Sequence, residues 1–210
     1  MTTAKGAARR AALLDAAERT LVGGGHAALS LRAVAEAAGV RLGHLQYYFP
    51  SRERLVEELL ARLLQRSLDR LTDVIPGPDD PDRAGGGTDG GADDPPARLN
   101  RLVGVLLAEQ TDPELVRVFV ELWALAARDE AVAVAVRAFY RRYAELVTDQ
   151  IRAHLPGATA EEHRARAEVF IALVEGSSLI RSGVAGTPSP TTDALISRTA
   201  LSLLCGAEPA

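Results

Sequence analysis

The chain has 210 residues, of which 47% are hydrophobic and 4% aromatic, and its net charge is −4. This length fits one ordinary domain or two small ones, with a buried core made mostly of Ala, Val and Leu. Such a composition favours helices, because Ala and Leu are strong helix formers and alternating β-branched runs are scarce. The acidic balance argues against a protein that coats nucleic acid indiscriminately, and a single Cys precludes an intrachain disulfide.

Basic residues are concentrated near the N-terminus. Residues 1–60 contain 8 Lys/Arg and 6 Asp/Glu, and the remainder of the chain carries a balance of −6. Because phosphate attraction depends on local charge, the overall acidity is no objection to DNA binding by this segment. No apolar run of about 18 residues occurs, so we expect no membrane span and, as the default, a cytoplasmic protein.

The first predicted helix spans residues 5–22 and ends at Gly23, Gly24 and Gly25. Basic side chains at its start either contact phosphate or stay solvated, and Thr2, Thr3 and Lys5 are candidates for contacts from an N-terminal arm. His26 follows in a loop, where we expect it to pack over the core of this segment.

Residues 30–55 have the pattern of two short helices joined by a tight turn. Ser30 is a good N-cap for the first of them. Ala35 is small enough for a second helix to cross closely over it, and Gly39 falls in the turn, where a positive φ favours glycine. Apolar residues then recur at helical spacing at Val40 and Leu45. This spacing is typical of a helix-turn-helix that binds DNA.

The opposite face of the second helix carries no carboxylate that would repel phosphate. Arg can bind guanine and Gln can bind adenine in the major groove, so Arg41, Gln46 and Tyr47 are the candidates for contacts at or near base edges. We expect His44, Arg52 and a half-buried Tyr48 to serve mainly in contacts to phosphate. The full predicted DNA-binding set is Ser30, Arg32, Arg41, Leu42, Gly43, His44, Gln46, Tyr47, Tyr48 and Arg52.

The segment from about residue 8 to residue 60 resembles the DNA-binding domain of the TetR family of transcriptional regulators. The matching motifs are Ala38-Gly39-Val40, Gly43, Leu45, Tyr47-Tyr48-Phe49 and Ser51-Arg52-Glu53-Arg54-Leu55. Gln46 stands where the family usually has Tyr, and Arg41 stands where Ser or Thr is common. Both lie on the recognition helix, so these departures affect which operator sequence is recognised and not the resemblance to the family.

The rest of the chain is predicted to be helical around one linker. A helix from Ser51 to about residue 74 connects the DNA-binding domain, residues 1–50, to the body. Residues 76–96 are rich in Gly, Pro and Asp, and we expect a disordered linker there. Further helices are predicted at about 97–109, 113–127, 129–154, 159–182 and 191–204, which makes an all-α protein of about nine helices with a C-terminal effector-binding and dimerisation domain over residues 97–210.

The last two predicted helices each carry an apolar face. In the resembled family these two helices pair with their counterparts in a second chain, and a palindromic operator requires such a dimer. The resemblance therefore implies a homodimer whose interface includes Val169, Leu173, Gly176, Ile180, Leu195, Ile196, Thr199 and Leu203.

The body more weakly resembles the subgroup of the family related to choline-responsive regulators. This resemblance rests on the stretches 119–123 and 139–143. It implies a small-molecule effector site, for which the candidates are Phe119, Trp123, Phe139, Tyr143, Phe170 and Ser177. For any single one of these side chains a place in the core is the favoured alternative, and we name no effector.

The sequence offers little support for an enzyme. It lacks a Gly-rich phosphate loop, a GxSxG motif and His or Cys at metal-ligand spacing, so we expect no catalytic residue, no metal and no cofactor. The prediction is a homodimeric, sequence-specific DNA-binding regulator, namely a repressor released from a palindromic operator by an effector. An activator, and a protein-interaction module that keeps the helix-turn-helix shape, are the alternatives.

Overall fold

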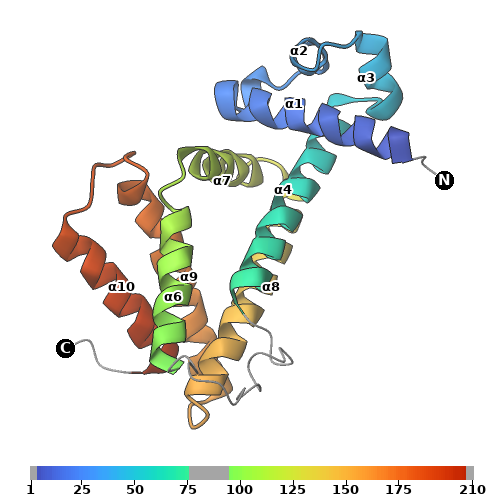
Figure 1. Cartoon of the computed structure of the whole chain (residues 1–210). Coiled ribbons are helices and arrows are strands. Elements are labelled where there is room, and N and C mark those ends of the chain that lie inside the picture. The colour runs from blue at the N-terminus through green and yellow to red at the C-terminus, as the bar shows by residue number, and fades with distance from the viewer. Residues whose placement is uncertain (1–3, 76–94, 207–210) are drawn as a thin grey trace, which may run out of the picture. The chain divides into compact units, whose positions relative to one another are not determined.

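The computed structural model describes residues 4–75 and 95–206. Within them the chain forms nine helices and no strand, so the predicted all-α class is confirmed (Figure 1). None of these helices combines the length and apolar character needed to cross a membrane. The helices are α1 (Ala4–Ala28), α2 (Leu31–Ala37), α3 (Leu42–Tyr48), α4 (Arg52–Val74), α6 (Pro95–Glu109), α7 (Pro113–Ala126), α8 (Glu130–His154), α9 (Ala160–Arg181) and α10 (Pro190–Cys205).

The predicted helices are all present, with ends that differ by a few residues. The main difference lies in α1, which continues through Gly23 and Gly24 and breaks only at Gly25, where φ is 67°. The predicted linker, residues 76–96, falls outside the described residues except for Pro95 and Pro96, which begin α6. Thr2 and Thr3, proposed for an N-terminal arm, also lie outside the described residues.

The chain divides into two compact units that are interleaved along the sequence. Unit 1 comprises residues 1–67 and 117–138, and unit 2 comprises residues 68–116 and 139–210. Three helices, α4, α7 and α8, therefore contribute residues to both units. The predicted domain boundaries remain predictions.

In unit 1, ion pairs align α4 with α1. Arg10 pairs with Glu58, and Arg62 pairs with Asp15. One turn further along both helices, Arg66 pairs with Glu18. Each partly exposed pair contributes at most about 1 kcal/mol, so their main effect is to set the register between two helices whose apolar faces supply most of the stability.

In unit 2, α10 packs against both α9 and α6 (Figure 1). Polar contacts from α9 complement this apolar packing. The Arg181 side chain donates from Nε to the Leu107 carbonyl of α6 at 2.9 Å and also pairs with Asp193 of α10. One guanidinium thereby ties three helices of the unit together.

Candidate nucleic-acid interface

The helix-turn-helix is built as its sequence pattern predicts. The Ser30 hydroxyl accepts a hydrogen bond from the Ala33 amide at 3.2 Å and so caps α2. Gly39 adopts a φ of 64° in the turn, a value that only glycine adopts without strain. Ala35 and Leu45 are buried where the two helices meet. This packing fixes the angle at which α3 presents its outer face.

The outer face of α3 is exposed and free of carboxylates. Arg41 precedes the helix, and the exposed side chains within it belong to His44, Gln46 and Tyr47. Tyr47 is 81% exposed, which is unusual for a large aromatic side chain. A face with these donors and flat rings is suited to base edges and phosphates in a major groove.

The other predicted DNA-binding residues surround this face. Ser30, Arg32 and Gly43 are exposed, whereas Leu42 and Tyr48 are half-buried. The Tyr48 ring lies 5.6 Å from the His44 ring and 5.2 Å from the Tyr47 ring, measured between centroids. Tyr48 therefore helps to orient two exposed neighbours on the same helix.

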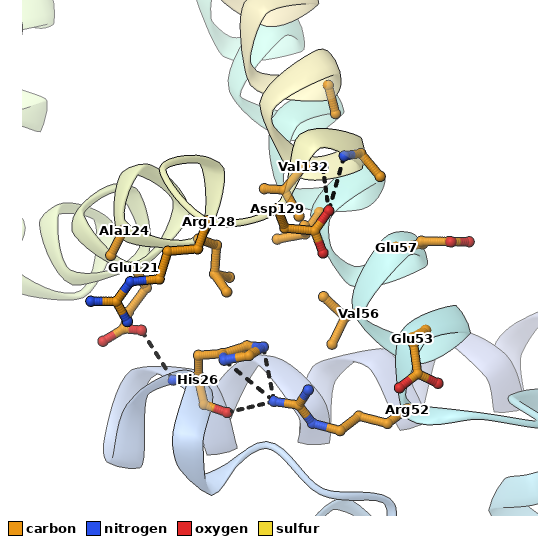
Figure 2. Close-up of a pocket in the computed structure, with 14 residues that line it drawn as sticks. His26, Arg52, Glu53, Val56, Glu57, Glu121, Ala124, Arg128, Asp129 and Val132 are labelled. Carbon is orange, nitrogen blue, oxygen red and sulfur yellow. Dashed lines mark hydrogen bonds between the residues drawn. The ribbon is translucent and has the colours of Figure 1, made fainter.

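Arg52 is the predicted phosphate contact whose surroundings differ most from expectation. Its Nε donates to the Leu29 carbonyl at 2.7 Å, and its Nη2 donates to the His26 carbonyl at 3.0 Å. The same Nη2 lies 2.8 Å from Nε2 of the His26 ring (Figure 2). These bonds hold the start of α4 against the segment that joins α1 to α2. A contact to phosphate stays a prediction for this side chain.

His26 is half-buried, lies in the last turn of α1 and not in the expected loop, and takes part in a network that the sequence did not reveal. Burial, followed by the nearby Arg52 charge, lowers the pKa of the imidazole, so the ring is neutral at pH 7. Its backbone amide donates to Oε2 of Glu121 on α7 at 3.0 Å (Figure 2). Glu121 and His26 are 95 positions apart, and neither belongs to a local motif that could have indicated the pairing.

Two N-terminal arginines acquire partners within unit 1. The Arg10 guanidinium lies 5.1 Å from the centroid of the Phe49 ring, in addition to its pair with Glu58. Arg9 donates to Nε2 of His44 at 3.4 Å. Arg10 therefore serves the packing of α1 on the end of the recognition helix, and Arg9 lies beside the exposed face.

The six residues predicted to line an effector site are divided between the two units. Phe139, Tyr143, Phe170 and Ser177 are buried in unit 2, and the rings of Phe139 and Tyr143 lie 6.3 Å apart. Phe119 and Trp123 are half-buried on the part of α7 that belongs to unit 1. Their role in effector binding stays a prediction.

The predicted dimer face remains accessible in the single chain. Val169 on α9 is 54% exposed and Leu195 on α10 is 51% exposed. Gly176 is exposed as well, while Leu173, Ile180, Ile196, Thr199 and Leu203 are half-buried. Large apolar side chains of this kind gather where a protein surface is covered by a partner.

A helix-turn-helix with an acid-free recognition helix, followed by a larger helical body, defines the class of DNA-binding transcriptional regulators. Residues 13–59 match the family model for bacterial regulatory proteins of the tetR family. Residues 95–205 match the model for the C-terminal part of the BetI-type transcriptional repressor. The chain belongs to the TetR family of transcriptional regulators.

Individual relatives agree with this assignment. The chain is 31% identical to an uncharacterized HTH-type transcriptional regulator in the dhlA 5′ region of Xanthobacter autotrophicus, over 80% of this chain and 76% of that protein. It is 39% identical to the HTH-type transcriptional repressor KstR of Mycolicibacterium smegmatis, over 51% of this chain and 46% of that protein. A putative transcriptional regulator from Pseudomonas aeruginosa shares the fold, with a TM-score of 0.74, 22% identity and coverage of 96% of this chain and 92% of that chain.

Proposed function

We propose that the chain acts as a homodimeric repressor that binds a palindromic operator through α3 and is released from it by a small-molecule effector. The observation that carries DNA binding is the exposed, carboxylate-free outer face of α3, with Tyr47 81% exposed beside Gln46. Repression is supported by the family model of the C-terminal part and by the relative KstR, both of which are described as repressors.

Dimerisation supplies the second recognition helix that a palindromic site requires. Its half-sites lie about one helical turn of DNA apart, or a multiple of that distance, so two copies of α3 must be held at a matching separation. The exposed apolar side chains of Val169 and Leu195 support pairing through α9 and α10. An isologous contact of this kind buries the same surface on both chains.

Release by an effector requires a conformational change that alters the spacing of the two recognition helices. The helix α4 is suited to transmit it, because it begins directly after the helix-turn-helix and contributes residues to both units. The aromatic side chains of Phe139, Tyr143 and Phe170 in unit 2 are the proposed lining of the effector site.

The decisive experiment is a footprint and gel shift of the full chain on DNA from upstream of its own coding region, with random duplex as competitor. We expect a protected palindrome and transcription that falls when the protein is added. Binding without preference for any duplex would favour the interaction module, and increased transcription would indicate an activator.

Gln46→Ala tests the recognition helix directly. We expect a loss of about 1–3 kcal/mol on the operator and a relaxed preference at one base position, because Gln can bond adenine through two hydrogen bonds. The matched control is Gln65→Ala, an exposed position on α4. An equal loss on all duplex sequences would limit Gln46 to contacts with phosphate.

A further inference from the structure

The last turn of α1 and the two residues before α2, together residues 26–30, are held by side chains of two other helices. From α7, the Glu121 carboxylate accepts from the His26 amide at 3.0 Å (Figure 2). From the start of α4, the Arg52 guanidinium donates to the carbonyls of His26 and Leu29, at 3.0 and 2.7 Å. All of these residues belong to unit 1. Residues 26–30 with these two side chains are referred to below as the α1–α2 joint.

The His26 ring adds to the joint a hydrogen bond that depends on its protonation state. Nη2 of Arg52 lies 2.8 Å from Nε2 of the ring and 3.3 Å from Nδ1. Because a guanidinium can only donate, the ring nitrogen that meets it must accept, and only a neutral imidazole has an accepting nitrogen. Burial, followed by the Arg52 charge, lowers the pKa of the ring, which agrees with this arrangement.

A proton on the ring would replace this attraction by a repulsion. Both nitrogens of an imidazolium donate, so the bond from Arg52 would be lost and two cations would face each other. The carboxylates of Glu121 and Asp129 act in the opposite direction on the pKa of the ring, because they attract its charged form. The joint therefore has two states, in which the ring is paired with Arg52 when neutral and with carboxylates when charged.

The other charged side chains around the ring are engaged elsewhere or exposed. The ring borders a cavity of about 480 Å³, whose remaining charged lining consists of Glu53, Glu57 and Arg128, and to which α2 contributes no residue. Glu53 accepts from its own amide and from the Ser51 hydroxyl, and Glu57 pairs with Arg54. Arg128 is exposed. The guanidinium and the two carboxylates named above therefore determine how the ring responds to protonation.

We propose that the neutral His26 ring positions the helix-turn-helix for DNA by holding Arg52 in the α1–α2 joint, and that protonation of the ring opens this joint. His26 acts through Arg52, which fixes the Leu29 carbonyl directly before the Ser30 cap of α2. Acidification thus weakens operator binding, although added positive charge by itself strengthens attraction to DNA. The inference rests on the proposed DNA binding by α3 and adds regulation by pH to it.

The first test uses the full chain without DNA. Hydrogen exchange over residues 29–33 reports on the joint, because the Leu29 amide bonds the His26 carbonyl and the Ala33 amide bonds the Ser30 cap. We expect protection, relative to the intrinsic exchange rate at each pH, to fall about threefold to tenfold from pH 7.5 to pH 5, as for loss of one hydrogen bond. The pKa of the His26 ring, followed by NMR, should lie below 6.5 and coincide with the midpoint of this change. Equal protection at both pH values would overturn the proposal.

A matched pair of variants assigns the pH dependence to this ring. His26→Gln cannot titrate but keeps an acceptor for Arg52 in its side-chain carbonyl, so protection of residues 29–33 should become independent of pH. The control is His154→Gln on α8, at a half-buried ring whose Nδ1 bonds the Gln150 carbonyl at 2.9 Å, and it should behave as the parent does. Circular dichroism checks that both variants fold. A pH dependence that persists in His26→Gln would belong to another group and would refute the proposal.

Operator binding provides the second test, by fluorescence anisotropy on the footprinted duplex at constant ionic strength. Comparison of the parent with His26→Gln cancels the contribution of other groups that titrate near DNA, such as His44. We expect the affinity of the parent relative to the variant to fall about threefold to tenfold from pH 7.5 to pH 5. An unchanged or rising ratio would show that the joint does not position the helix-turn-helix. If the parent prefers no duplex at either pH, the proposed function fails, and the measurement without DNA by itself supports or overturns the switch in the joint.

Discussion

Arg52 shows how a side chain can match a family motif and still have a second use. Its guanidinium donates to two backbone carbonyls, at His26 and Leu29. The His26 carbonyl also accepts from the Leu29 amide at 3.2 Å, so loss of Arg52 affects the Leu29 carbonyl more. We expect Arg52→Ala to lower the free energy of unfolding by about 1–3 kcal/mol, the cost of leaving a partly buried acceptor without its donor. Urea denaturation at fixed protein concentration measures this change.

Arg32→Ala is the matched control for Arg52. Arg32 is exposed on α2, so its removal should leave the unfolding free energy unchanged. If Arg32 contacts phosphate, the DNA-association constant of the variant should depend less steeply on salt. The slope of its logarithm against the logarithm of salt concentration should become shallower by about one unit. The opposite pattern, with unchanged stability and a shallower slope for Arg52→Ala, would assign Arg52 to the phosphates after all.

Glu175 makes the stability of unit 2 depend on pH. Burial, followed by the neighbouring Glu109 charge, raises the pKa of its carboxyl from 4.5 to about 7, against a hydrogen bond from Tyr140 that lowers it. Arg70, 3.6 Å from Glu109, is the nearby cation. Between pH 4.5 and 7 the folded state holds a proton that the unfolded state has released, so stability falls as pH rises through this window.

Glu175→Gln should remove this pH dependence. The neutral amide keeps the shape of the carboxyl, so we expect the variant to be more stable than the parent by about 1–3 kcal/mol at pH 8 and to differ little from it at pH 4.5. Urea denaturation across this pH range measures both values. Glu168→Gln, at an exposed position on the same helix, is the control. A parent whose stability is flat from pH 4.5 to 7 would refute the assignment.

At the scale of elements, the end of α1 depends on one particular glycine of three. Gly25 has a φ of 67°, and a Cβ added there would lie 2.9 Å from Oε1 of Glu121. Gly23 is helical and exposed, and a Cβ there would meet nothing within 4 Å. Gly25→Ala should therefore destabilise the protein by about 1–2 kcal/mol, whereas Gly23→Ala should stabilise it by about 0.5–1 kcal/mol.

Thermal melting of the two variants makes this comparison. Because both change Gly to Ala within the same run, they alter the unfolded chain equally, and the difference between them reports the folded state. Similar melting temperatures would show that the α1 break tolerates a side chain and that Glu121 moves aside at little cost.

The same region shows which structural features can be predicted from the sequence and which cannot. Ser30, Gly39 and Leu45 were identified because capping, positive φ and helical spacing are local properties that leave local patterns. Three consecutive glycines could not reveal which one breaks the helix, since each of them permits a break. The contact of Glu121 with the His26 amide, 95 positions away, has no pattern at all and follows only from tertiary packing.

The same distinction between local patterns and tertiary contacts applies to the residues of the candidate DNA-binding site. The exposed face of α3 follows from helical periodicity, so its members could be assigned from the sequence. The sequence also predicts a phosphate contact for Arg52, but the carbonyl partners of this side chain depend on where α1 ends. The interleaving of the two units was likewise not predictable, because periodicity indicates that a helix has an apolar face without identifying what that face meets.

For the whole molecule, the proposed function depends on the association of two chains. Val169 on α9 is 54% exposed and lies on the predicted dimer face, and Val134 on α8 is 55% exposed and lies outside it. The same substitution to Glu can therefore be compared at two sites of nearly equal exposure. A charge buried without a partner strongly disfavours an interface, whereas a charge at a solvated position costs little.

We expect Val169→Glu to shift the protein from dimer to monomer at micromolar concentration and to weaken operator binding, because a single recognition helix engages only one half-site. Val134→Glu should remain dimeric and bind the operator as the parent does. Sedimentation equilibrium measures the association, and fluorescence anisotropy on the footprinted duplex measures DNA affinity. A parent that is monomeric under these conditions, or equal behaviour of the two variants, would show that α9 does not form the interface and that operator recognition is organised by other contacts.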